Sequence, residues 1–425
     1  MRIARPRYGN GRGLLQLRPA GGSMRAHVYP LDAVRFFAAL SVMLCHLSFY
    51  SWASKASAVG HMLNHATAFP AATPFTSWGW VGVEIFFVIS GFVIANSANN
   101  VSPIAFAKSR VLRLYPAVWI CAFITLAAWL LAGGETMRHL SREMLRSLTL
   151  WIFGPWVDGV YWTLAVELVF YAIIFALLLF RRFDKLVWVA WALLAVSAIY
   201  LTAFIFSPAL FHSSLGRQIV MYSEVLPYRY GAFFALGIWM WLFTMKAVKP
   251  SDWIGIGLAA AVGVLDIVGH AHDLVAHEVQ PGLAVSDIVP ELVWLAAVVL
   301  MFVVARTPER FAPKTKAGQD VFKHAGQMTY PLYLTHSVVG AFLIRVMVGA
   351  GVNAWAALAF AIVTMLCVAY IVARYGEPAM RKALRGVWER AEGSIKNARA
   401  LAFLFKPGGR AAAKGAVGTL GVAAE

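Results

Sequence analysis

Charged residues are scarce in this sequence: they make up only 13% of its 425 positions, and just 20 residues are acidic. A soluble domain usually carries about 25% charged residues, so this composition argues against a soluble protein. Only three cysteines occur, Cys45, Cys121 and Cys367, each inside an apolar run, which argues against a disulfide framework or a zinc site. Hydrophobic residues instead make up 60% of the chain and predict a protein that resides in lipid.

Several chemical signatures are also missing. The sequence has no P-loop, GxSxG or HExxH motif, and residues 1–30 contain no apolar segment followed by a cleavage site, so we expect no cleaved signal peptide. We interpret residues 1–30 as a basic, disordered tail, with Met24 as an alternative start. Residues 270–278, HAHDLVAHE, match no established metal-ligand spacing and are interpreted as a solvated loop, so we expect no metal site.

Long apolar runs predict the fold. A bilayer core of about 30 Å requires roughly 20 mostly apolar residues per helix, and the sequence offers about ten such runs. These predicted spans are 32–51, 78–97, 114–132, 161–180, 186–206, 228–245, 252–269, 286–305, 330–348 and 353–373. We therefore predict an all-α, polytopic membrane bundle within a domain at 31–385, followed by a basic C-terminal tail at 386–425. The stretch 135–150 is expected to form a short amphipathic helix at the interface.

Positive charge segregates to one side of this topology. With the N-terminus in the cytoplasm, 30 of the 37 Lys and Arg residues fall on the cytoplasmic side, as the positive-inside rule requires. This pattern predicts an inner-membrane protein with both termini in the cytoplasm. It also explains the net charge of +17 without nucleic acid, which we exclude as a partner.

The first span holds the densest set of ionisable residues. Asp32, Arg35 and His46 return to nearly the same helix face, and His46 would lie about 16 Å above Arg35. His46 could act as a general base on an acceptor hydroxyl or briefly carry an acyl group. The structural alternative is that Arg35 extends its side chain to the cytoplasmic interface, where Asp32 caps it, and that His46 is hydrogen-bonded to a neighbouring helix.

Two further spans carry intramembrane carboxylates, which are expensive to bury and therefore candidate functional groups. The second span places Glu84 in its outer half and Ser90 and Gly91 near its middle, where glycine permits close packing or a local break. The fourth places Glu167 one to two turns inside the outer surface. Trp162 beside it could stack on a sugar or simply belong to the interfacial aromatic belt.

Basic groups lie nearer the cytoplasm. Arg110 and Arg113 stand one turn apart at the start of the third span, and arginine forks suit the phosphates of coenzyme A, although an ordinary positive-inside anchor would look the same. His336 comes early in the ninth span and should therefore lie nearer the cytoplasm than His46. It could contact coenzyme A or be structural.

Seven blocks in order along residues 31–385 resemble the acyltransferase-3 family of membrane proteins. The blocks are LDAVRFFAALSVMLCH, GWVGVEIFFVISGF, RVLRLYPAVW, YWTLAVELVFY, RYGAFFALGI, MTYPLYLTH and YGEPAMRKALR. The resemblance implies a stand-alone O-acyltransferase that takes an acyl group from cytoplasmic acyl-coenzyme A and transfers it to a hydroxyl, often on a glycan. Glu84 stands where the family often has aspartate.

By this resemblance His46, Arg35 and Glu167 are the expected catalytic residues, and Arg110, Arg113, Arg35 and His336 the expected residues for acetyl-coenzyme A. Glu84, Trp162 and Ser90 are expected to bind the acceptor, a polysaccharide or related carbohydrate that approaches from the periplasm past Glu84 and Glu167. Coenzyme A would serve as a co-substrate, with no permanently bound cofactor. Two alternatives are a transporter or lipid-linked sugar exporter that uses the buried charges as a path, and a non-catalytic assembly subunit; the absence of an internal repeat weakens the first.

Overall fold

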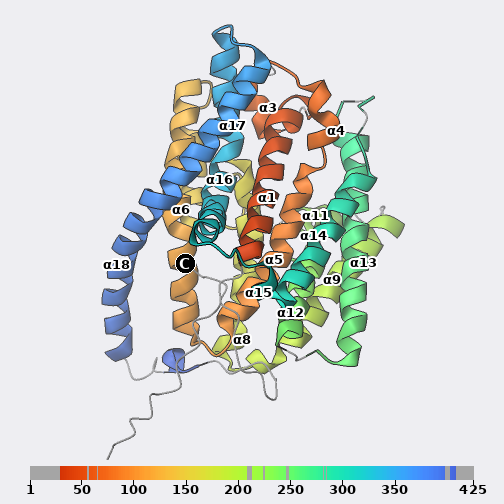
Figure 1. Ribbon diagram of the computed structural model, residues 1–425, viewed down its shortest axis with the longest axis vertical. Coiled ribbons are helices and arrows are strands. Elements are labelled where there is room, and N and C mark those ends of the chain that lie inside the picture. The colour runs from red at the N-terminus through yellow and green to blue at the C-terminus, as the bar shows by residue number, and fades with distance from the viewer. Residues whose placement is uncertain are drawn as a thin grey trace, which may run out of the picture.

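The chain folds into a bundle of long apolar helices. The computed structural model describes residues 29–54, 57–64, 66–207, 213–223, 225–245, 248–280, 282–283, 285–397 and 403–407. Within these residues every regular element is a helix, apart from an isolated bridge between Ser54 and Val279. Most of the long helices run lengthwise through the molecule (Figure 1). The predicted all-α membrane bundle is confirmed.

The longer helices have the following bounds. They are α1 (Tyr29–Cys45), α5 (Gly82–Ala98), α6 (Pro103–Ala132), α7 (Met137–Thr149), α8 (Trp162–Leu179), α9 (Leu186–Phe206), α11 (Ser214–Ser223), α12 (Gly231–Thr244), α13 (Pro250–Asp273), α14 (Ile288–Arg306), α16 (Lys316–Gly349), α17 (Ala354–Ile371) and α18 (Glu377–Asn397). Short helices are α2 (Ser51–Ala53), α3 (Ala58–Leu63), α4 (Thr73–Thr76) and α15 (Pro308–Phe311). Tighter or wider turns are η1 (His46–Tyr50), η2 (Pro70–Ala72), η3 (Gly79–Val81), η4 (Gly159–Tyr161), η5 (Phe183–Lys185), η6 (Leu274–Glu278) and η7 (Val372–Gly376).

The ten predicted spans all appear as helices. By length and apolar composition, 9 helices of the described chain could cross a membrane. The remaining predicted span, 228–245, contains the 14-residue α12, which is shorter than the roughly 20 residues a crossing requires. Nearly all of α12 is buried, and it packs against α5, α9 and α13. Because protein rather than lipid surrounds α12, its length does not have to match the bilayer.

Glycine allows α5 and α12 to cross at backbone contact. A Cβ added to Gly91 would lie 2.3 Å from the carbonyl oxygen of Phe234, and one added to Gly237 would lie 2.1 Å from that of Val88. No side chain fits at such distances, so the crossing requires glycine on both helices. Of the two roles open to Gly91, the structure shows close packing, and α5 continues unbroken through it.

Two amphipathic helices lie outside the apolar core of the bundle. The amphipathic helix predicted at 135–150 is present as α7, where the Thr136 hydroxyl accepts a hydrogen bond from the His139 N–H and caps the first turn. The last long helix, α18, lies along the outside of the bundle beside α6 (Figure 1), where Lys108 near the start of α6 pairs with Glu389 and Glu392. The predicted C-terminal tail from 386 is thus helical as far as Asn397; the predicted tail at 1–30 lies almost entirely outside the described residues.

Candidate active site

A narrow cavity of about 100 Å³ lies between α1, α5, α6, α8 and α16. Its charged lining residues are Arg35, Arg110, Arg113 and Glu167, which come from three different helices. We call it the inner cavity. The structure thus brings together four residues that the sequence predicted from separate spans.

The three arginines face this cavity from within the bundle rather than from its surface. Arg110 is only 6% exposed. It lies inside α6 rather than at its end, because α6 begins at Pro103, about two turns before the arginine pair. Its guanidinium lies 5.6 Å from the ring of Tyr171, and that of Arg113 lies 5.3 Å from the ring of Tyr330. These positions do not fit the alternative of a simple interfacial anchor.

Two guanidinium nitrogens of this cluster have no hydrogen-bond partner among the residues that the structure describes. Among the described residues, buried Nε of Arg35 and buried Nη2 of Arg110 make no hydrogen bond. Buried donors are normally satisfied, and an unsatisfied charged donor is costly, so the cavity is suited to an anionic ligand. The main opposing charge near Arg35 comes from Asp32 and Glu167.

Glu167 is fixed by hydroxyl groups inside the same cavity. The Ser90 hydroxyl donates a 2.7 Å hydrogen bond to Oε1 of Glu167, and the hydroxyl of Tyr171, one helical turn further along α8, also bonds the carboxylate. Ser90 and Glu167 therefore lie with the arginines, whereas the sequence placed Glu167 on the acceptor's path. The sequence overlooked Tyr171, although its i,i+4 spacing from Glu167 was a usable signal.

His46 and His336 form a pair further along α1 and α16. Nε2 of His336 lies 3.3 Å from Nδ1 of His46, and the ring centroids are 5.0 Å apart. The prediction that His336 lies nearer the cytoplasm than His46 is wrong, because α16 begins at Lys316, well before the apolar run, and carries His336 to the level of His46. The structure does not place His336 among the arginines.

Backbone contacts assign the tautomers of this pair. Nδ1 of His336 lies 2.8 Å from the Tyr333 carbonyl oxygen, and Nδ1 of His46 lies 2.9 Å from that of Val42. Carbonyl oxygens only accept, so each Nδ1 carries the proton and each Nε2 is unprotonated. Among the described residues no hydrogen bond reaches Nε2 of His46. This atom is therefore available as a base or nucleophile.

A local change in helix type occurs at His46. α1 ends at Cys45 and continues directly into η1, a π-helical turn that begins with His46. Wide turns of this kind are rare and occur often at functional sites, because they displace side chains from the regular helical register. No pattern in the sequence predicts this change of helix type.

The histidine pair lies between the inner cavity and a second cavity. On α16 Tyr333 lines the inner cavity and Val338 lines the second, with His336 between them. Asp158, which precedes α8, holds this part of α16 because its carboxylate accepts from the Val338 N–H at 3.1 Å. Burial raises the pKa of Asp158 to about 6.

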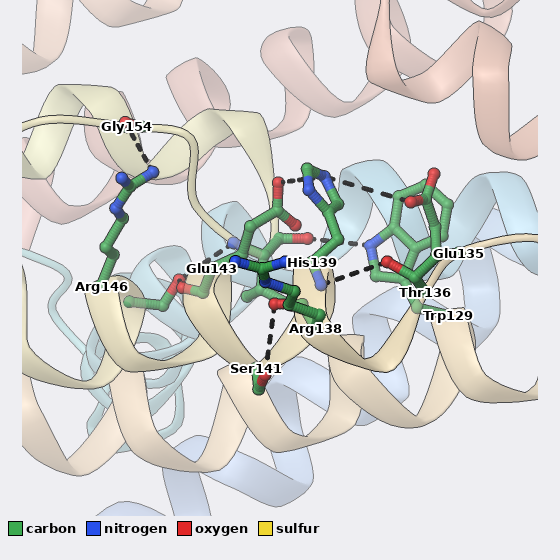
Figure 2. Close-up of polar contacts among 11 residues, drawn as sticks. Trp129, Glu135, Thr136, Arg138, His139, Ser141, Glu143, Arg146 and Gly154 are labelled. Carbon is green, nitrogen blue, oxygen red and sulfur yellow. Dashed lines mark hydrogen bonds and ion pairs between the residues drawn. The ribbon is translucent and has the colours of Figure 1, made fainter.

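This second cavity, which we call the outer cavity, has a volume of about 1030 Å³ and is bordered by α7 and the start of α8. Trp162 lines it, as the acceptor-side prediction requires, and its ring centroid lies 5.2 Å from that of Tyr230. Its wall also carries a side-chain cluster on α7 in which Nε2 of His139 lies 2.9 Å from Oε1 of Glu143 (Figure 2).

Glu84 lines neither cavity. It is 4% exposed and lies near Asp266 and Arg229. Nε of Arg229 donates to Asp266 at 2.7 Å, and Nη2 of Arg229 lies 3.0 Å from Nδ1 of His270. His270 belongs to α13, so its interpretation as part of a solvated loop is wrong. The sequence did contain a signal for this buried cluster, because Arg229 and Asp266 are charged residues within two apolar runs.

Taken together, the fold and these residues define a polytopic membrane protein with a buried cationic cavity, a histidine pair beyond it and a wide cavity at the far end. Residues 28–374 match the family model of the acyltransferase domain named acyltransferase-3. The chain therefore belongs to the acyltransferase-3 family, and the predicted family and enzyme class, an O-acyltransferase, are confirmed.

Three relatives illustrate the range of this similarity. Nodulation protein 10 of Rhizobium leguminosarum bv. viciae is 28% identical over 39% of this chain and 49% of its own length. Acyltransferase MdmB of Streptomyces mycarofaciens is 27% identical over 75% of this chain and 80% of its own. An O-acetyl transferase of Shigella phage Sf6 is 27% identical over 33% of this chain and 43% of its own length. The chain thus spans about half of the first relative, and no solved structure matches it significantly.

Proposed function

We propose that this protein transfers a short acyl group, acetyl, from cytoplasmic acetyl-coenzyme A to a hydroxyl of a carbohydrate on the outer side of the inner membrane. The observation that carries the proposal is the inner cavity, which is lined by Arg35 and Arg110, each with one buried guanidinium nitrogen that makes no hydrogen bond among the described residues. Coenzyme A carries phosphates, and arginine forks bind phosphate with paired, charge-assisted hydrogen bonds.

The orientation rests on the distribution of charge. The arginines of the inner cavity come from near the starts of α1 and α6, and these helix starts are among the segments that carry most of the lysines and arginines of the chain. By the positive-inside rule this supports a cavity directed toward the cytoplasm, with both termini on that side. The acyl donor is made in the cytoplasm. The outer cavity then faces the periplasm, where an exported glycan is found.

The chemistry follows from the tautomer of His46. Nε2 accepts the proton of the acceptor hydroxyl as that oxygen attacks the thioester carbonyl; the carbon–sulfur bond breaks, and the departing thiolate takes up a proton to leave as free coenzyme A. Alternatively, Nε2 attacks the thioester first and forms an acyl-imidazole, which the hydroxyl then opens. Trapping of acylated His46 in the absence of acceptor separates the two routes.

The names of two relatives support a carbohydrate acceptor and an acetyl group. ExoZ of Rhizobium meliloti, named an exopolysaccharide production protein, is 30% identical over 29% of this chain, and the phage relative is named an O-acetyl transferase. The test is release of free thiol from acetyl-coenzyme A by the purified protein with glycan acceptors. We expect acceptor-dependent release; its absence with every acceptor class, together with normal glycan acetylation in a deletion strain, would contradict the proposal.

A further inference from the structure

The outer cavity has the size and the lining of an oligosaccharide site. Its volume of about 1030 Å³ lies at the top of the range of about 300–1,000 Å³ found for pockets that enclose a drug-sized ligand. A single hydroxyl-bearing small molecule would leave most of it filled with water. The dimensions therefore suit a segment of several sugar residues.

Aromatic rings form the inner end of this cavity. Trp162 packs against Phe87 and Tyr230 at centroid distances of 6.1 and 5.2 Å, and these two rings also contact each other, which fixes the orientation of Trp162. Thr163, the next residue, lines the inner cavity and hydrogen-bonds the Tyr333 hydroxyl at 3.1 Å. Trp162 thus stands where the two cavities come closest. A sugar ring has an apolar face that stacks on such a flat side chain.

Carboxylates from α7 line the wall nearby. Glu143 is buried and paired with His139, and Oε2 of Glu135 lies 4.0 Å from the same imidazole (Figure 2). A carboxylate accepts hydrogen bonds only, so both groups match the hydroxyl donors of a neutral sugar and repel a carboxylate or phosphate on an acidic one. Of the three arginines of α7, Arg138 and Arg142 are exposed, and Arg146 is half-buried and donates to the Gly154 carbonyl oxygen at 2.9 Å; none of the three lines the cavity.

The positive charge at this wall is already neutralised. Arg229 is the only Lys or Arg among the described lining residues. Its Nε lies 2.7 Å from Oδ1 of Asp266, which is buried and does not line the cavity. Asp273 adds a further carboxylate to the lining. The described lining therefore carries an excess of negative charge, opposite in sign to the inner cavity.

From these observations we propose that the outer cavity binds an uncharged oligosaccharide segment as acyl acceptor, with Trp162 stacking on the sugar to be acylated and Glu135 and Glu143 selecting against acidic glycans. This inference rests on the proposed acyl transfer and adds the acceptor class and its site. Stacking would hold the sugar at the inner end of the outer cavity, whose lining residue Val338 follows His336 by two positions on α16.

The experiment compares uncharged and uronic-acid-containing oligosaccharides of equal length as acceptors for the purified full-length protein with acetyl-coenzyme A. We expect turnover with uncharged members of the panel and little with acidic ones. Trp162→Ala should raise the acceptor KM about tenfold, the value of one lost stacking contact, and leave the KM for acetyl-coenzyme A unchanged. Trp162→Phe, which keeps a stacking face, should recover most of the affinity and shows that the site still folds.

A second pair of variants tests the selection by charge. Glu135→Gln combined with Glu143→Gln should raise the relative rate with acidic oligosaccharides, whereas Arg142→Gln on the exposed face of α7 should not change it. Preference for acidic members in the unaltered protein, or an unchanged acceptor KM in Trp162→Ala, would overturn this inference alone. Absence of turnover with every oligosaccharide would contradict the proposed transfer to carbohydrate itself.

Discussion

The inner and outer cavities differ in size, charge and construction. The inner cavity measures about 100 Å³ and is lined by arginines on long helices, whereas the outer measures about 1030 Å³ and is lined by carboxylates and aromatic rings. Much of the outer lining comes from α7, from the connection before α8 and from the connection after α11. Binding sites on connecting segments vary easily, whereas those on packed helices do not. We infer a donor site of fixed shape and an acceptor site that can change between relatives.

The largest expected effect concerns the histidine pair, which lies between the two cavities. His46→Ala removes the free Nε2, so the transfer rate should fall by about 10²–10⁴, the usual contribution of a general base, while binding of acetyl-coenzyme A persists. Turnover and acetyl-coenzyme A binding by the purified protein measure the two quantities. His324→Ala is the matched control, because Nδ1 of His324 makes the same backbone contact on an exposed surface. Full activity of His46→Ala would remove His46 from the chemistry.

The next variant separates the inner cavity from the outer one. Arg110→Gln removes a buried charged donor, so the KM for acetyl-coenzyme A should rise about 10- to 100-fold while the acceptor KM stays constant. Lys108→Gln, two residues earlier on α6 and paired with α18, should change neither value. Equal effects of the two substitutions would show that position 110 acts only through general positive charge.

The rigidity of the inner cavity can be tested at the crossing of α5 and α12. Gly91→Ala forces a Cβ against the Phe234 carbonyl and should destabilise the protein by about 1–3 kcal/mol. A lower midpoint of thermal unfolding in detergent would show this. Gly257→Ala is the control, because nothing lies within 4 Å of a Cβ there and alanine is favoured within a helix. An unchanged midpoint for Gly91→Ala would mean that the crossing adapts easily.

The smallest expected effect sharpens the role of Glu167. Ser90→Ala removes one hydrogen bond to this carboxylate, so catalytic efficiency with acetyl-coenzyme A should fall about fivefold, corresponding to about 1 kcal/mol. Steady-state kinetics at several acetyl-coenzyme A concentrations measure it. Ser97→Ala on the same helix removes only a bond to the Ile94 carbonyl and serves as the control. A selective rise in acceptor KM would instead move Ser90 to the acceptor side.

The sequence predicted the helices better than the depth of individual residues. Apolar runs long enough to cross a bilayer are a strong local signal, and each of the ten predicted spans is a helix. The level of His336 relative to His46 was misjudged because α16 begins well before its apolar run, at Lys316, and the burial of Arg110 was not apparent because α6 likewise begins early, at Pro103. A hydropathy pattern detects only the apolar part of a helix, so it does not predict a polar first segment.

Contacts between distant residues were the other gap. The residues of the Ser90–Glu167 hydrogen bond are 77 positions apart, and those of the His46–His336 contact are 290 positions apart. No periodicity within one sequence predicts such contacts. The outer cavity escaped prediction for the same reason, because its wall is assembled from α7, the segment before α8 and the end of α13. Trp162 was found only because it stands beside Glu167 in one short block.

The most direct test of two opposite cavities is transfer across a membrane. The protein would be reconstituted in vesicles in one orientation, verified by protease access to α18, with labelled acetyl-coenzyme A on one side and an uncharged oligosaccharide on the other. We predict labelled oligosaccharide when the coenzyme A compound is on the α18 side and the sugar is on the α7 side. Product formed only when both substrates are on the same side would contradict the account.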